Sequence, residues 1–428
     1  MITAKAFAGK HYAVYGLARS GLATAVALLA SGARVTGWDS KQEAREKAPP
    51  GTEIANLDEE ELSQFDSLVV TPGLPLNRHP IAQRALEAGV EIIGDIELFA
   101  RARPELPPHK VVGITGTNGK STTTALIYHI LKTAGVPTTM GGNIGLPILL
   151  QDPLPEGGVY VLELSSYQID LTQSLDCDVA VLLNITPDHL DRYDAFDAYK
   201  ESKMRLFRMQ SPNHVAVFTG EDQFGYDAYQ DRWEGAHETT LLARCEDAFG
   251  QESWPTLQGP HNAQNAAAAI ATCKALGIGE AQIEESLRTY PGLPHRMERV
   301  REKDGVLFVN DSKATNPTAT APALAAFPSI RWILGGRAKT DNLDECVPHF
   351  GHVRSAYTIG EAGEFFAKLL AAHMPVANCE TLENALNRAA EDSQAGDTVL
   401  LSPACASFDQ FKDFEQRGDR FRDLVGAL

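Results

Sequence analysis

The segment Val111–Thr123 constrains the fold most strongly, because it changes from a strand pattern to a helix pattern across a glycine-rich turn. Val111 and Val112 belong to a short apolar run that is typical of a buried strand, and residues 125–131 have a helical pattern. In such a strand–turn–helix corner, backbone amides and the helix N-terminus can surround phosphate oxygens. The segment therefore predicts an α/β domain built around a phosphate-binding loop.

The side chains of this loop favour a nucleoside triphosphate as the ligand. Lys120 can reach the terminal phosphates, and a hydroxyl group at Ser121 or Thr122 can bind Mg²⁺. The spacing differs from the general pattern, because Gly113 and Gly119 enclose five residues where four are usual. The alternative is a turn with glycines for geometric reasons alone, but the Gly-Lys-Ser-Thr run favours phosphate binding.

Composition limits the possible partners and compartments. The 428 residues suggest about three domains. The net charge of -18 makes nucleic acid and anionic membrane surfaces poor partners. Six widely spaced cysteines form no CxxC pair, which is typical of reduced thiols in a cytosol. We see neither a signal-peptide core nor an apolar run of the ~20 residues that a membrane helix needs. We therefore expect a cytoplasmic protein without membrane insertion.

The N-terminal part has the outline of a nucleotide-binding βαβ unit. The strand His11–Tyr15 leads through the turn Gly16–Gly21 into a helix, and a second strand, Ala33–Trp38, ends at Asp39. Ala18 stands where a dinucleotide fingerprint has its middle glycine. A Rossmann-like domain that binds another nucleotide, or none, is therefore at least as well supported as a dinucleotide-binding one.

Strands alternating with helices continue along the whole chain, which indicates an α/β protein of three domains. We expect a Rossmann-like N-terminal domain over 1–103, which ends near a proline-rich linker at 101–108. A central P-loop ATPase-like domain with a mostly parallel sheet follows over 104–294. The last domain, 295–428, is expected to be Rossmann-like α/β, with a small parallel sheet and a final helix over 408–426.

Two polar residues of the central domain follow predicted strands. Ligands of parallel sheets bind at the carboxyl ends of the strands, so Glu163 and Asn184 should face the phosphate loop. Glu163 can hold a metal ion at the phosphates, although a solvated or helix-capping glutamate is the simpler alternative. His189 follows the same strand as Asn184 and is either a ligand or substrate contact, or a structural histidine.

Two further clusters lie in the C-terminal part. Arg296 and Lys313 supply positive charge in an acidic protein, and Asp311 can accept hydrogen bonds from ribose hydroxyls. Surface charge beside a turn explains these residues equally well. In Ser402–Phe414, small residues that include Ser407 leave open amides for a carboxylate. A capped amphipathic helix is the alternative.

Taken together, these segments resemble the Mur ligase family. The resemblance covers the second and third domains in the family's order, while the first domain matches only in outline, and the five-residue loop spacing is normal for the family. The matching runs are Gly116–Thr122, Gly141–Gly145, Glu163–Ser166, Asp188–Tyr193, His261-Asn262, Leu293–Arg296, Asn310–Asn316 and Ser402–Ser407.

The resemblance implies an ATP-dependent amide ligase of peptidoglycan precursor synthesis, with ATP and Mg²⁺ as cofactors. The runs Asn310–Asn316 and Ser402–Ser407 point to the branch that adds D-glutamate to UDP-MurNAc-L-Ala through an acyl phosphate. The expected partners are these two small molecules, with no nucleic acid and no membrane insertion, and the expected state is a monomer. The first domain would bind the UDP end, which would explain the missing middle glycine.

The resemblance also implies roles for individual residues. The expected catalytic residues are Lys120, Glu163, His189 and Lys203, and the expected metal ligands are Ser121, Glu163, His189 and Lys203. The expected ATP contacts are Gly116, Thr117, Asn118, Gly119, Lys120, Ser121, Thr122, Asn262, Arg296 and Asp311. The expected substrate contacts are Asp39, Thr71, Gly73, Asn143, Ser165, His189, Thr315, Lys339, Ser407 and Phe414, of which Thr315, Lys339, Ser407 and Phe414 would form the D-glutamate pocket.

Lys203 would be the family's lysine that carries a carbamate. Spacing alone favours a solvent-facing lysine on an amphipathic helix. A charged ammonium repels Mg²⁺ and has no lone pair, whereas a neutral amine that adds CO₂ becomes a two-oxygen anion of the kind Mg²⁺ prefers.

Three alternatives remain open from the sequence. The nearest is a related ligase that adds another amino acid, or a folylpolyglutamate synthetase. An NAD-dependent dehydrogenase built on residues 11–39 would leave the phosphate loop unexplained. A P-loop switch protein would hydrolyse nucleotide slowly and would not respond to UDP-sugars.

Overall fold

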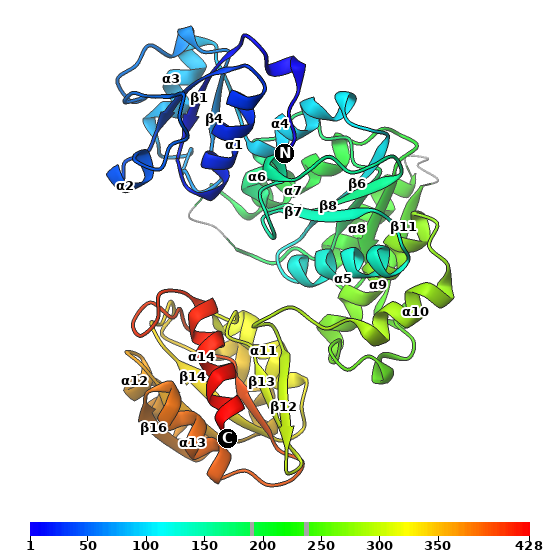
Figure 1. The fold of residues 1–428 in the computed structure, drawn as a ribbon. Helices are drawn as coiled ribbons and strands as arrows, with labels where there is room; N and C mark the ends of the chain where they lie inside the picture. The colour runs from blue at the N-terminus through cyan, green and yellow to red at the C-terminus, as the bar shows by residue number, and fades with distance from the viewer. Residues whose placement is uncertain (189–191, 235–238) are drawn as a thin grey trace. The chain divides into compact units, whose positions relative to one another are not determined.

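The computed structural model describes residues 1–188, 192–234 and 239–428 and contains three β-sheets flanked by helices (Figure 1). Contacts divide the chain into two compact units. The first unit comprises residues 1–248 and 264–286 and holds the first two sheets. The second unit comprises 249–263 and 287–428 and holds the third sheet.

The first sheet is fully parallel and has the strand order β3-β2-β1-β4-β5. The order reverses between β1 and β4, and ligands of such sheets bind outside the carboxyl ends of the strands at that point. The expected βαβ unit is therefore present. The elements are β1 (His11–Tyr15), α1 (Arg19–Ala30), β2 (Arg34–Trp38), α2 (Gln42–Arg45), β3 (Thr52–Ile54), β4 (Ser67–Val70), α3 (Pro80–Ala88), β5 (Glu91–Ile93) and α4 (Asp95–Ala102).

The inner strands β1 and β4 of this sheet are almost wholly buried, because helices cover both faces. Side chains alternate along β1, so Tyr12 and Val14 join the core that includes residues of α1 and α4. Ala13 and Tyr15 join a separate core with Ile81 of α3. β1 is thus buried on both sides, and its carboxyl end is the part left for ligands.

The central sheet is also parallel and has the order β11-β10-β9-β6-β8-β7, so this prediction is confirmed. Strands β9, β6 and β8 are neighbours, and their carboxyl ends lie at one edge of the sheet. The elements are β6 (His109–Thr115), α5 (Lys120–Thr133), β7 (Thr138–Gly142), β8 (Gly158–Glu163), α6 (Ser166–Asp170), β9 (Val179–Leu182), α7 (Phe196–Arg208), β10 (Val215–Thr219), α8 (Gln223–Glu234), β11 (Thr240–Ala243), α9 (Pro260–Ala275) and α10 (Glu280–Thr289).

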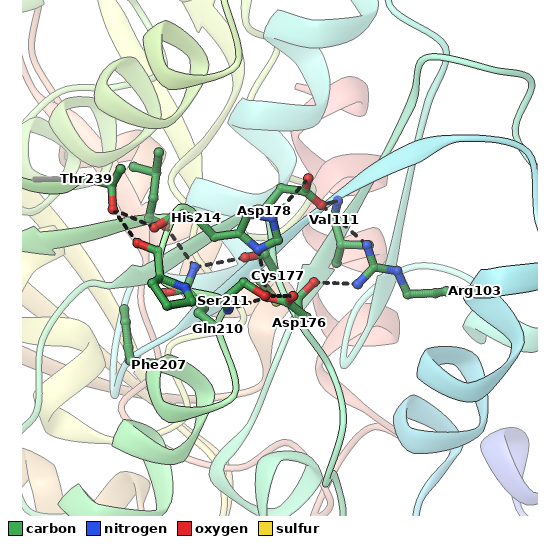
Figure 2. A network of polar contacts seen from close by, with 12 residues as sticks. Arg103, Val111, Asp176, Cys177, Asp178, Phe207, Gln210, Ser211, His214 and Thr239 are labelled. Atoms are coloured by element: carbon green, nitrogen blue, oxygen red, sulfur yellow. Dashed lines mark hydrogen bonds and ion pairs between the residues drawn. The ribbon is translucent and has the colours of Figure 1, made fainter. Parts of the chain in front are cut away.

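A polar network fixes the opposite, amino edge of this sheet (Figure 2). Asp176 accepts hydrogen bonds from Ser211 Oγ at 2.5 Å and lies 2.7 Å from Nδ1 of His214. Asp178 accepts the backbone N–H of Val111 at 2.8 Å. The network holds the starts of β6, β9 and β10 together, so the register of these strands is set away from their carboxyl ends.

The third sheet is mixed, and the expectation of a parallel sheet there was wrong. Its order is β12-β13-β17-β14-β15-β16, and β12 pairs antiparallel with β13. The two strands meet in a tight turn at Asp304 and Gly305, whose φ values of 52° and 76° suit a two-residue hairpin. The elements are β12 (Glu298–Lys303), β13 (Val306–Asn310), α11 (Pro317–Ala325), β14 (Ile330–Gly335), β15 (Val353–Ile359), α12 (Gly363–Leu370), β16 (Val376–Glu380), α13 (Leu382–Glu391), β17 (Thr398–Leu401) and α14 (Phe414–Ala427).

The sequence predicted a final helix that starts at residue 408, but the helix starts at Phe414. Asp413 has an extended backbone, and its side chain accepts the N–H of Gln416 at 2.7 Å. Asp413 is thus the N-cap: it satisfies the backbone N–H of Gln416 in the first turn, and the helix begins directly after it. Within the described parts of the chain, no helix is long and apolar enough to cross a membrane.

Candidate functional site

The phosphate loop lies between the end of β6 and the start of α5. Gly119 caps the helix with a φ of 84°, and a Cβ atom there would lie 2.1 Å from Oδ1 of Asn265. A Cβ atom on Gly116, whose φ is 151°, would lie 3.0 Å from the Cβ atom of Leu183. Both positions therefore require glycine, which leaves the loop amides close to the helix N-terminus.

Asn184, which follows the neighbouring strand β9, holds this loop. Its Oδ1 accepts the N–H of Asn118 at 2.8 Å, its Nδ2 donates to the carbonyl of Asn118 at 3.1 Å, and its own carbonyl accepts the N–H of Thr117 at 2.8 Å. The expectation that Asn184 faces the loop is confirmed. Gln264 of α9, which the sequence did not single out, accepts from Asn184 Nδ2 at 3.3 Å.

Two lysines converge on the loop. Nζ of Lys120 donates to the carbonyl oxygens of Gly116 and Thr117 at 2.8 and 2.7 Å. Nζ of Lys203 donates to the same carbonyl of Gly116 at 2.9 Å and lies 4.6 Å from the ring centroid of Tyr199. Only 1% of Lys203 is exposed, so it is not the solvent-facing lysine that spacing alone favours.

The surroundings of Lys203 favour its neutral amine. Burial lowers the pKa of this lysine well below its ordinary value, and the charge on Lys120 lowers it further. Asp188 and Asp170 act in the opposite direction and only partly offset the effect on the pKa. The neutral form of the Lys203 amine, which is the nucleophilic form, is therefore favoured relative to that of an exposed lysine.

Glu163 ends β8, as expected, and has only 2% of its surface exposed. Its Oε1 accepts from Nδ2 of Asn143 at 2.7 Å, and its backbone carbonyl accepts the N–H of Asn143 at 2.9 Å. Its buried Oε2 has no hydrogen-bond partner among the described residues. An unsatisfied buried carboxylate oxygen is costly unless a cation or another donor meets it.

The donors on this edge suit a hard cation. Ser121 lies buried in the first turn of α5, and Glu163 and Lys203 belong to the same compact unit. His189, expected to be a metal ligand, catalytic residue and substrate contact, lies outside the described residues. Among the described residues, no three or more His, Cys, Asp or Glu side chains form a metal-binding group. A cation at this site would therefore need Ser121 and Lys203 as ligands in addition to the carboxylate of Glu163.

Ser165 has a clear local role. Its Oγ accepts the N–H of Gln168 at 3.3 Å, and the side chain of Gln168 accepts the N–H of Ser165 at 3.1 Å. This reciprocal capping box starts α6 directly after Glu163. Substrate binding by Ser165 stays a prediction, because the cap alone explains the residue.

The residues expected to bind the UDP end gather at the carboxyl ends of β1, β2 and β4. Asp39 accepts the N–H of Leu17 at 2.8 Å and so closes the glycine turn. Gly16 has a φ of 94°, and a Cβ atom there would lie 2.3 Å from Oγ1 of Thr71. Gly73 follows in the same loop, where a Cβ atom would meet nothing within 4 Å. The turn and the loop after β4 thus form one packed surface.

Two residues of the expected amino-acid pocket meet in the second unit. Nζ of Lys339 donates to Oγ1 of Thr315 at 3.3 Å. Ser407 is buried, and Phe414 starts α14 with Nζ of Lys313 3.9 Å from its ring centroid. The structure therefore supports a cationic and hydroxyl-bearing site at Lys339 and Thr315, while its ligand stays a prediction.

Three residues expected to contact ATP also belong to the second unit. Asp311 is buried and accepts from Ser402 Oγ at 2.8 Å and from the N–H of Met297 at 3.2 Å. Burial raises the pKa of Asp311 to about 7, although these hydrogen bonds and the charge of Arg296 lower it. Asn262 lies at the start of α9, where its Nδ2 donates to the carbonyl of Gln258 at 3.0 Å.

Family models match all three parts of the chain. The N-terminal domain of MurD-like Mur ligases matches residues 10–94, the Mur ligase middle domain matches 114–273, and the Mur ligase glutamate ligase domain matches 295–405. A "UDP-N-acetylmuramoylalanine--D-glutamate ligase" from Novosphingobium aromaticivorans is 60% identical over 430 residues, covering 100% of this chain and 97% of the relative. The chain belongs to the Mur ligase family. The protein of the same name from Sphingopyxis alaskensis is 57% identical and is covered over its full length.

Solved Mur ligases share the fold. The UDP-N-acetylmuramate-alanine ligase MurC from Thermotoga maritima is 17% identical, with a TM-score of 0.58, and 98% of this chain and 99% of that chain are covered. MurF from Acinetobacter baumannii is 20% identical, with a TM-score of 0.58. The match covers 98% of this chain and 91% of that chain. The full-length match to ligases leaves the dehydrogenase and switch-protein alternatives without support.

One buried residue of this Mur ligase was missed from the sequence. Arg417 in α14 is fully buried and donates to the carbonyls of Ser312 at 2.8 Å, Cys405 at 3.1 Å and Gly335 at 3.5 Å. Burial lowers its pKa to about 10. Arg417 therefore links the segment 310–316, which carries Thr315, to the segment 402–407, which carries Ser407. In the sequence it looks like a surface residue, because it is an arginine in an amphipathic helix.

Proposed function

We propose that this Mur ligase joins D-glutamate to UDP-MurNAc-L-Ala and converts ATP to ADP and phosphate. The observation that carries the proposal is the 60% identity, over the whole chain, to a relative named for this ligation. The position of Lys120 at the phosphate loop agrees with it, because the reaction brings two anions together.

The reaction would proceed in two displacements. An oxygen of the alanyl carboxylate attacks the γ-phosphorus of ATP, ADP leaves, and an acyl phosphate forms. The amine of D-glutamate then attacks the acyl carbon, phosphate leaves with the attacking oxygen, and the amine loses a proton. Lys120 would lower the barrier to the first displacement by neutralising charge that develops on the phosphates.

We further propose that Ser121, Glu163, His189 and Lys203 hold Mg²⁺, with Lys203 as a carbamate. The buried Oε2 of Glu163, which no described residue meets with a hydrogen bond, and the lowered pKa of Lys203 support this, since a neutral amine adds CO₂ to give a carbamate and a proton. When bound, Mg²⁺ would offset the negative charge of the phosphates. The amide of Asn143 would keep Glu163 oriented through the 2.7 Å hydrogen bond.

The three parts of the chain would divide the substrates among them. Residues 1–103 would hold the UDP end through Asp39, Thr71 and Gly73, and residues 104–294 would hold ATP, with Asn143 and Ser165 near the acyl end. Residues 295–428 would hold D-glutamate through Thr315, Lys339, Ser407 and Phe414, and Asn262, Arg296 and Asp311 would complete ATP binding. The proposed state is a monomer and the proposed compartment the cytoplasm; cysteines that form no disulfide among the described residues agree with that compartment.

Phosphate release with a panel of amino acids tests the proposed specificity. ATP and UDP-MurNAc-L-Ala would be supplied with D-glutamate, L-glutamate, D-alanine or diaminopimelate, and each component would be omitted in turn. We expect release only with D-glutamate and only in the complete mixture. Equal or faster release with another amino acid would favour a related ligase, and release without UDP-MurNAc-L-Ala would contradict the proposal.

A further inference from the structure

Arg192 contacts the loop that follows β4. Its Nη2 donates to the carbonyl of Leu74 at 2.7 Å and to that of Pro72 at 3.3 Å, while its Nη1 donates to the carbonyl of Gly73 at 3.3 Å. Three successive backbone carbonyls therefore meet one guanidinium group. Because this group is planar and presents donors in a fixed fork, it sets the direction of the loop as well as its distance.

Arg192 also contacts helix α6 of the central part of the chain. Its guanidinium carbon lies 4.2 Å from the ring centroid of Tyr167, which belongs to the short helix that follows Glu163. The neighbouring Tyr193 donates to Asp170 of the same helix at 2.8 Å, and its hydroxyl lies 3.2 Å from Oγ of Ser202. Arg192 thus contacts the helix that begins three residues after Glu163, and its neighbour Tyr193 contacts Ser202, which precedes Lys203.

The loop that Arg192 holds is continuous with the glycine turn of the first sheet. Thr71 donates its N–H to the carbonyl of Tyr15 at 3.1 Å and packs on Gly16, while the N–H of Leu74 bonds to the carbonyl of Thr71 at 3.0 Å. Any shift of residues 72–74 would therefore also move the surface expected to hold the UDP end.

Apolar packing does not fill this contact. A cavity of about 160 Å³ lies between the loop and α6, and its lining residues include Pro72, Leu74, Tyr167 and Arg192. An incompletely packed interface resists displacement less than a close-packed one. Beside this cavity, the hydrogen bonds of Arg192 add to the apolar core shared by the first two sheets, which includes Val69, Leu164 and Ile169.

We propose that Arg192 is a positioning residue that fixes the UDP-substrate loop relative to the segment carrying Glu163 and Lys203. The inference rests on the proposed function, in which one sheet would hold the UDP end and the other the reacting carboxylate. Loss of Arg192 would leave each end bound but would misplace the carboxylate, and a misplacement of about 1 Å can lower a rate by about a hundredfold.

The test compares Arg192→Ala with Arg84→Ala in the full-length protein. Arg84 is a matched control, since it also donates to two carbonyls, those of Leu57 and Glu60, but within the first sheet's own region. The measurements are kcat and KM from ADP release, the affinity for UDP alone by calorimetry, and Tm. Arg192→Gln and Arg192→Lys serve as second variants in case the alanine variant does not fold.

We expect Arg192→Ala to lower kcat by about tenfold to a hundredfold, with the affinity for UDP and the KM for ATP changed by less than about threefold. Arg192→Lys should recover part of kcat, because an ammonium can reach only some of the carbonyls, and Arg84→Ala should retain kcat. Unchanged kcat in Arg192→Ala, or a loss of UDP affinity in proportion to kcat, would overturn the positioning role. If the unmodified protein released no ADP with both substrates, the proposed function itself would be wrong.

Discussion

Lys120 and Lys203 donate to the same backbone oxygen, the carbonyl of Gly116, at 2.8 and 2.9 Å. Two ammonium groups at one acceptor repel each other, and Lys203 is the more buried of the two. Its proton is therefore the one that is more easily lost, which agrees with the lowered pKa of its amine. The phosphate loop consequently brings together Lys120, whose ammonium stays charged, and Lys203, whose neutral amine is favoured.

Lys203→Ala tests whether this neutral amine becomes a carboxylate-like ligand. We expect the rate of ADP release to fall by about a hundredfold or more, because a major electrostatic contact is lost. Acetate should partly restore the rate by occupying the vacated space with two oxygens. Lys203→Arg should be inactive and not rescued, since its fixed positive charge fills the site. Full activity of Lys203→Ala would rule out the role.

Comparing Gly119→Ala with Gly135→Ala separates a steric clash in the phosphate loop from the general strain of alanine at a positive φ. The two glycines have similar φ values of 84° and 79°, but an added Cβ atom clashes with Asn265 only at Gly119. We expect Gly135→Ala to cost about 1 kcal/mol of stability and to keep full activity. Gly119→Ala should lose ATP binding, measured as KM for ATP or by calorimetry. Similar ATP affinities in the two variants would contradict the assigned loop.

The raised pKa of Asp95 should make the free energy of unfolding depend on pH. It is buried at the start of α4, and burial raises its pKa to about 6, although backbone hydrogen bonds lower it. The folded state thus binds more protons than the unfolded state between about pH 4 and pH 6, so this residue's contribution to stability falls as the pH rises through that window. The total change is about 3 kcal/mol.

Asp95→Asn should remove this dependence, because an amide does not titrate and still accepts a backbone hydrogen bond. Urea unfolding at pH 4 and pH 7 should show the variant gaining stability relative to the unmodified protein at the higher pH. A difference between the two proteins that does not change with pH would show that Asp95 does not titrate in this window.

Lys339→Ala tests the expected D-glutamate pocket. Removing the ammonium that lies 3.3 Å from Oγ1 of Thr315 should raise the KM for D-glutamate by about tenfold or more, since a hydrogen bond to a charged group contributes about 1.5–3 kcal/mol. The KM for ATP should not change. Lys368→Ala is the control, because Lys368 pairs with Glu364 on the exposed face of α12. An equal effect of both substitutions would contradict the pocket.

The parts predicted well from the sequence are those that follow directly from chain geometry. Glu163 ends β8 and Asn184 follows β9, the two parallel strands on either side of β6, so their position near the phosphate loop followed from the topology. The glycine turn after β1 followed in the same way. These predictions need only the order of strands and the rule that ligands bind at their carboxyl ends.

The parts that were missed depend on packing between distant segments. The pattern around Lys203 shows an amphipathic helix, but not which polar residue the neighbouring loop covers. The charged sequence of β12 hides an edge strand, because its residues are mostly exposed and only its backbone pairs with β13. Arg192 and Arg417 both bind carbonyls of remote loops, and backbone acceptors leave no mark in a sequence.

The transfer of one oxygen atom tests the central claim most directly. UDP-MurNAc-L-Ala labelled with ¹⁸O in its carboxylate would be incubated with ATP and D-glutamate, and the released phosphate would be analysed by mass spectrometry. Attack of the carboxylate on the γ-phosphorus, followed by attack of the amine on the acyl carbon, leaves one carboxylate oxygen on the phosphate. We predict one ¹⁸O in each phosphate released per ligated product, whereas ligation with unlabelled phosphate would contradict the acyl phosphate route.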